Sequence, residues 1–119
     1  MEHVTINDPP TMNLLGLLLA NIIQRNLSDE AKLRRFQKLS GDLEVHAGEM
    51  CVTLTFADGK MTVFRGPADK PKAVVSGAMD SLLGLALGGG MVLPWLAGRI
   101  KTRGNLLMLL ALKPLLATE

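Results

Sequence analysis

The chain has 119 residues, which fits one domain with its own core but not two independently stable domains. With 48% hydrophobic and 20% charged residues it is too apolar to be disordered away from its ends. Thirteen Lys and Arg against eleven Asp and Glu leave a net charge of only +2, too little for binding a nucleic-acid backbone. We therefore predict a single domain over residues 1–119 with no nucleic-acid partner.

The N-terminal part predicts an extended segment followed by an apolar helix. Residues 1–10 lack the basic start of a secretory signal and end in Pro9-Pro10. Thr11 can then cap a helix over residues 11–27, in which the polar residues fall on a narrow stripe. Because this helix is apolar most of the way round, one side of it is available to a second subunit or another partner.

A second helix and a first strand follow. Ser28 is expected to cap this helix, with Glu30 and Arg34 paired four residues apart on a solvated face. From Gly41 the hydrophobic period becomes that of a strand, which turns Glu44 and His46 away from the apolar side. We expect His46 to be a surface residue.

The dipeptide Asp58-Gly59 predicts a hairpin between strands at 50–56 and 61–65. A two-residue turn makes cross-strand partners of Ala57 and Lys60, Phe56 and Met61, Leu54 and Val63, and Val52 and Arg65. One face of the hairpin is then almost wholly apolar.

The C-terminal part predicts a strand near 73–76, a helix at 78–87, a short apolar segment at 91–97, a fifth strand at 99–103 and a last apolar helix capped by Asn105. Residues 81–98 carry no charge, but Gly88-Gly89-Gly90 and Pro94 would break a membrane-spanning helix. The element order indicates an α+β fold, with helices layered on a mostly antiparallel sheet.

The residues indicate no catalytic, metal or cofactor site. Cys51 lies five residues after His46, beyond a bend that leaves their pairing unspecified, and is interpreted as a small packed residue. One Cys and two His, His3 and His46, cannot form a Cys/His zinc set, and no phosphate-binding loop is present. A single cysteine excludes an internal disulfide and favours the cytoplasm.

The most informative feature is the excess of apolar residues. Residues 11–27, 82–97 and the last helix are all more apolar than packing on one side requires. A lipid-like ligand in a cavity, a second subunit or a membrane surface could cover this area, and a tightly packed Leu-rich core without a cavity is the remaining alternative.

Six segments in order and spacing resemble a sterol carrier protein-2 (SCP2-type) domain, over roughly residues 28–116. They include the Ala57-Asp58-Gly59-Lys60 turn, the strand 73–77, the helix 79–85 and the run Gly98-Arg99-Ile100-Lys101. The chain resembles small stand-alone prokaryotic members. The resemblance implies a five-stranded sheet with helices on one side and an apolar cavity between them for sterols, fatty acyl chains or other lipids. Two features differ: many members carry a tryptophan ahead of the Asp-Gly turn, whereas the only tryptophan here is Trp95, and the chain ends without the Ser-Lys-Leu address of some eukaryotic relatives.

On this interpretation the hairpin supplies the floor of a ligand site and the late apolar segments supply its walls. The predicted lining residues are Val52, Leu54, Phe56 and Val63 in the floor, Leu82, Leu83, Leu87, Met91, Leu93 and Trp95 in one wall, and Leu107, Leu110 and Ala111 in the other. Arg99, Lys101 and Arg103 alternate along the fifth strand and could contact an anionic membrane during ligand exchange.

The sequence therefore predicts a non-enzymatic protein of the cytoplasm that binds and transfers lipids or other long apolar molecules without a cofactor. The alternative is a homodimeric accessory protein that uses its N-terminal helix to dock on a lipid-modifying enzyme and has no ligand cavity.

Overall fold

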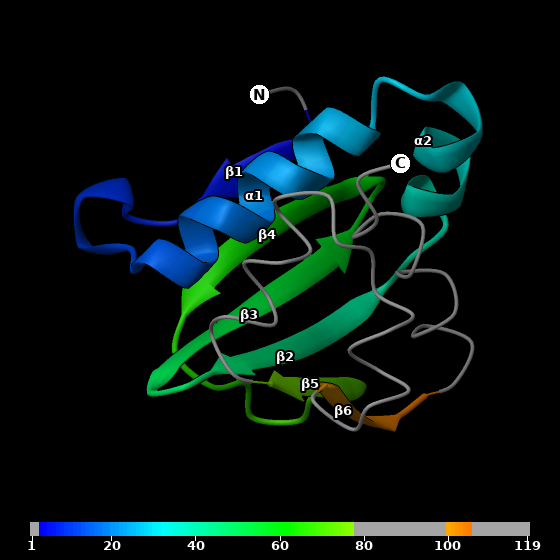
Figure 1. The fold of residues 1–119 in the computed structure, drawn as a ribbon. Helices are drawn as coiled ribbons and strands as arrows, with labels where there is room; N and C mark the ends of the chain where they lie inside the picture. The colour runs from blue at the N-terminus through cyan, green and yellow to red at the C-terminus, as the bar shows by residue number, and fades with distance from the viewer. Residues whose placement is uncertain (1–2, 78–99, 106–119) are drawn as a thin grey trace.

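The computed structural model describes residues 3–77 and 100–105, apart from the side chains of residues 100–102. Six strands form one mixed sheet in the order β1-β4-β3-β2-β5-β6 (Figure 1). Their bounds are β1 (Val4–Ile6), β2 (Gly41–Ala47), β3 (Met50–Ala57), β4 (Lys60–Arg65), β5 (Ala73–Gly77) and β6 (Ile100–Gly104). The predicted α+β class is confirmed.

The sheet has one strand more than predicted and is less antiparallel. Residues Val4–Ile6 were expected to be merely extended, but they form β1, which pairs in parallel with β4 at its edge. Three residues are too few to give a period-2 signal in the sequence. β2 also pairs in parallel with β5, and the remaining pairs are antiparallel.

The N-caps of both helices lie one to two residues later than predicted. Thr11 lies in a short 3-10 turn, η1 (Pro9–Thr11), and α1 (Leu14–Asn26) is capped by Asn13, whose side chain accepts from the Gly16 amide at 3.0 Å. The Asn13 side chain also donates to the carbonyl of Cys51 at 3.3 Å, which ties the start of α1 to β3.

The second helix, α2 (Glu30–Gln37), is capped by Asp29, not Ser28. The Asp29 carboxylate accepts from two free amides of the first turn, whereas the Ser28 hydroxyl donates back to the carbonyl of Arg25. The predicted pair of Glu30 and Arg34 is confirmed at 2.9 Å, but both side chains are exposed, so it contributes little to stability.

The predicted register of the hairpin is confirmed at all four pairs. Asp58 and Gly59 have φ values of 54° and 74°, the left-handed backbone that a tight hairpin turn requires and that Asp-Gly tolerates. This register puts alternate residues of β3 and β4 on one apolar face.

The core lies between that face and α1, which packs against β1, β3 and β4 (Figure 1). Leu15, Leu19 and Ile23 of α1 are buried there. α2 is anchored at the end of the sheet by Phe36, whose ring meets Phe56 edge to face at 5.9 Å between centroids. α1 thus covers the β1, β4 and β3 side of the apolar face, and α2 lies at the end of the sheet.

Several predicted elements lie outside the described residues: the helix at 78–87, the segment 91–97 and the last helix after Asn105. Among the described residues, no helix is long and apolar enough to cross a membrane.

Gly104 is predicted to be essential for attachment of β6, and Gly66 provides a matched control. Both have φ near +100°, but a Cβ at Gly104 would lie 2.5 Å from the Lys72 carbonyl oxygen, whereas one at Gly66 would meet nothing within 4 Å. Gly66→Ala should lower the free energy of unfolding by about 1–3 kcal/mol from backbone strain, and Gly104→Ala by clearly more. Urea denaturation of both variants measures this, and equal losses would contradict the predicted clash.

Candidate functional site

The two faces of the sheet offer two different candidate sites. On the apolar face, Val52, Leu54, Phe56 and Val63 lie together and are at most 2% exposed. These are the predicted floor residues that the structure describes. The other predicted lining residues lie outside the described residues: Leu82, Leu83, Leu87, Met91, Leu93, Trp95, Leu107, Leu110 and Ala111.

Val63 lies under α1. A Cβ added to Gly16 of α1 would come within 3.3 Å of a Val63 methyl group, so helix and strand are in close contact here. This part of the floor is therefore covered by the protein itself.

The apolar face continues beyond β3, away from α1. It carries further buried residues that the site prediction did not include, namely Leu43, Val45 and Ala47 of β2 and Ala73 and Val75 of β5. Their alternation along residues 43–47 and 73–75 is visible in the sequence. The buried apolar face of the sheet thus extends from β4 to β5.

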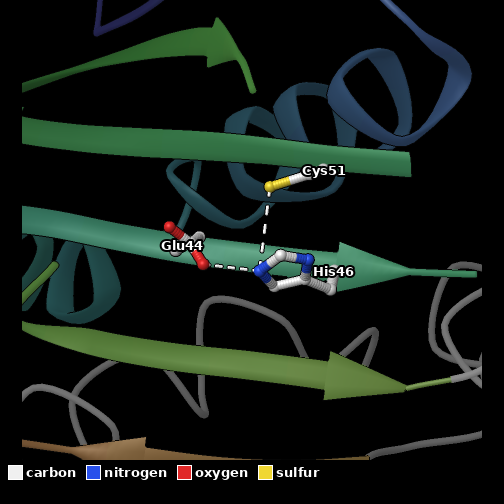
Figure 2. Close-up of side chains that lie close together, drawn as sticks. All are labelled: Glu44, His46 and Cys51. Carbon is white, nitrogen blue, oxygen red and sulfur yellow. Dashed lines mark hydrogen bonds and ion pairs between the residues drawn. The ribbon is translucent and has the colours of Figure 1, made fainter. Parts of the chain in front are cut away.

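On the opposite face, Glu44 and His46 of β2 and Cys51 of β3 form a cluster (Figure 2). His46 Nε2 lies 2.5 Å from Glu44 Oε2 and 3.8 Å from Cys51 Sγ. Glu44 is buried, while His46 and Cys51 are partly exposed. The prediction that His46 points away from the apolar side is confirmed.

The tight β2–β3 turn brings the cluster together. Ala47 pairs with Met50 across the two-residue turn at Gly48-Glu49, so His46 lies directly opposite Cys51. Gly48 has φ +59°, which favours glycine. A bend of unknown length between the strands leaves this pairing open in the sequence, although Gly48 was a signal for a tight hairpin.

The cluster is held in a polar network. The Ala68 amide donates to Glu44 Oε1 at 2.9 Å, which leaves Oε2 for His46. The pKa of the Glu44 carboxyl is lowered, mainly because His46 hydrogen-bonds to it, and the Ala68 amide and the positive charge of Arg103 act in the same direction against burial.

Cys51 is a poor nucleophile in this arrangement. Burial and the negative charge of Glu44 both raise the pKa of its thiol above the ordinary value, which keeps it protonated. The arrangement therefore does not activate a thiolate beside the imidazole.

The predicted basic row is described in part. The backbone of β6 pairs Lys101 with Ser76 and Arg103 with Val74, which places both positions on the face that carries Glu44 and His46. The Arg103 side chain is exposed, and Arg99 lies outside the described residues.

The chain forms an α+β domain with one buried apolar sheet face, and similarity to known proteins gives the family. The model of the SCP-2 sterol transfer family matches residues 19–117, so the chain belongs to this family. No curated protein sequence matches the chain.

Solved structures agree with this assignment at the level of the fold. Palmitated SCP2L2 from Aedes aegypti superimposes with a TM-score of 0.66 at 16% identity, covering 88% of this chain and 95% of that one. The ubiquinone synthesis protein UbiJ-SCP2 gives 0.60 at 17% identity, with 88% and 93% covered. Sterol carrier protein 2 from Yarrowia lipolytica gives 0.57 at 16% identity, with 81% and 84% covered.

Replacing Glu44 with Gln is predicted to cost stability in a pH-dependent way. Because the carboxyl pKa is lowered by folding, the ionised form stabilises the protein fully above the ordinary value of 4.5 and progressively less as the pH falls through the lowered pKa. Glu44→Gln should therefore lower the free energy of unfolding by about 1–2 kcal/mol at neutral pH and by less at an acidic pH below 4.5.

Urea denaturation in chelator-containing buffer at both pH values measures the difference. Glu49→Gln is the control, since Glu49 is exposed in the neighbouring turn and should show no such change. A cost for Glu44→Gln that does not depend on pH would contradict the prediction.

Proposed function

We propose that the protein is a non-enzymatic carrier of the cytoplasm that binds lipids with long apolar chains, in a cavity between the apolar sheet face and the late apolar segments. The observation that carries this proposal is the buried apolar face from β4 to β5, which α1 covers from the β1, β4 and β3 side. Membership of the SCP-2 sterol transfer family supports it.

Such a site needs no dedicated polar motif. Burial of an acyl chain contributes roughly 0.8 kcal/mol per CH₂ before the costs of ordering the ligand. The β2 and β5 floor is built from aliphatic residues, which discriminate weakly between chains of similar width. We therefore assign a ligand class, including fatty acyl, sterol-like and isoprenoid molecules.

Palmitate is a suitable probe, because the similar SCP2L2 structure from Aedes aegypti is that of a palmitated protein. Native mass spectrometry of the delipidated full chain should show palmitate uptake in a stoichiometric complex, and the melting temperature should rise with palmitate. Absence of both effects with palmitate, a sterol and an isoprenoid would overturn the proposal.

Large side chains in the proposed walls should reduce binding. Leu83→Trp and Leu110→Trp are expected to fill space for the ligand and weaken palmitate binding roughly tenfold or more, since overpacking costs about 1–3 kcal/mol. Leu17→Trp is the matched control, because Leu17 is 39% exposed on α1. Unfolding of both wall variants, with a stable control, would show instead that these residues are packed core.

The basic row is proposed to contact anionic membranes during ligand exchange. Each of Arg99, Lys101 and Arg103 would contribute about 1 kcal/mol near such a surface, and the effect would fade with salt. Co-sedimentation with phosphatidylserine vesicles should decrease when all three are replaced by Gln. Equal binding of wild type and triple variant would remove the row from the mechanism.

A second candidate function is a homodimeric accessory protein that docks on a lipid-modifying enzyme through its N-terminal helix. The exposure of Leu14 and Leu17 on the outer side of α1, at 53% and 39%, favours it. Light scattering at micromolar concentration separates the two candidates: a dimer without lipid uptake supports the second, and a monomer with lipid uptake supports the first.

A further inference from the structure

The polar face of the sheet carries a cluster that the lipid-carrier function does not use. Among the described residues, Glu44, His46 and Cys51 each present one donor atom, and these atoms all lie within 4.8 Å of one another. Figure 2 shows the imidazole nitrogen Nε2 between the carboxylate and the sulfur. We propose that these three residues bind a zinc ion, with water or a small external ligand in the fourth position.

The donor types match zinc. A thiolate, an imidazole nitrogen and a carboxylate oxygen are all ordinary zinc ligands, and three protein ligands with one open position are typical of accessible zinc sites. A count of Cys and His alone excludes a zinc set in this sequence because it omits the carboxylate. Magnesium and calcium are disfavoured because they require oxygen ligands throughout.

The separation of the sulfur and nitrogen donor atoms is close to that of two ligand atoms around a zinc ion. Two ligands of a tetrahedral zinc ion, at about 2.3 Å for sulfur and 2.0 Å for nitrogen, are about 3.5 Å apart. The Sγ–Nε2 distance in the structure is 3.8 Å. The Oε2–Nε2 distance of 2.5 Å is that of a hydrogen bond, so Glu44 must withdraw by somewhat under 1 Å to admit the ion between them.

The surroundings favour a preformed site. His46 and Cys51 are cross-strand partners in a tight hairpin, so the backbone fixes their separation. The Ala68 amide holds the other carboxylate oxygen, as outer-shell partners of metal ligands do. The His46 side chain is 39% exposed, which gives an ion access from solvent.

Charge and protons balance in the bound state. Zinc brings two positive charges, Glu44 contributes one negative charge, and Cys51 contributes a second by releasing its thiol proton to solvent. His46 binds through the Nε2 lone pair, with its remaining proton on Nδ1. Arg103 of β6, which β5 separates from β2, acts on Glu44 through its positive charge and opposes cation binding, but the carboxylate and thiolate together offset the charge of the ion.

Cobalt(II) provides a direct test, because it replaces zinc and gives a sulfur-to-cobalt charge-transfer absorption only when a thiolate is bound. The full chain, stripped with a chelator, should develop this absorption on titration with cobalt(II) and lose it on addition of zinc. Cys51→Ser should abolish the absorption, and His46→Gln and Glu44→Gln should each weaken zinc binding at least about 100-fold in competition with a chromophoric chelator.

Two substitutions outside the cluster serve as controls. Glu49→Gln removes an exposed carboxylate three residues from His46, and His3→Gln removes the other imidazole. Both should keep the absorption and the zinc affinity of the wild type. Circular dichroism of every variant shows whether it is folded, and the lipid measurements are separate from this test because they concern the opposite face.

Absence of the charge-transfer absorption in the folded wild-type chain would overturn the proposal. So would zinc affinity that is unchanged in folded Cys51→Ser and His46→Gln variants, since binding would then occur elsewhere. Loss of zinc binding in these variants with retention in both controls would support it.

Discussion

The cross-strand register of two tight hairpins is the constraint on which the rest of the structure depends. The turns at Gly48-Glu49 and Asp58-Gly59 fix β2, β3 and β4 relative to one another. A shift of one residue in either register would turn every side chain of a strand to the opposite face. The β2–β3 register therefore places both the Glu44, His46 and Cys51 cluster and the apolar residues of β2 and β3, and the β3–β4 register adds Met61 and Val63 to the apolar face.

The same register accounts for how differently the two faces are built. Burial of the aliphatic side chains on one face stabilises the folded state in proportion to the apolar area buried, and this needs no fixed geometry. On the other face the buried Glu44 must have hydrogen-bond partners, and it has them in His46 and Ala68. One face therefore depends on the amount of apolar surface that it buries, whereas the other holds its polar atoms at defined separations.

Local signals in the sequence were sufficient for the hairpin and insufficient for the edges of the sheet. Asp58-Gly59 predicts its turn because few other residues adopt two successive left-handed conformations, and the pairs from Val52–Arg65 to Ala57–Lys60 follow by counting. The parallel pairing of β1 with β4, and of β2 with β5, depends on contacts distant in sequence, which no local pattern encodes. The cluster could have been predicted only from the β2–β3 register, which depends on recognising a two-residue turn at Gly48.

The pairing of β1 with β4 also limits strand addition at this edge of the sheet. Without β1, the outer side of β4 would offer six residues of unpaired backbone, a template for strands of other molecules. β1 replaces that edge with one of only three residues, followed closely by Asp8 in a left-handed conformation and Pro9-Pro10. Proline has no amide to donate, so the sheet ends here with little to which another strand could add.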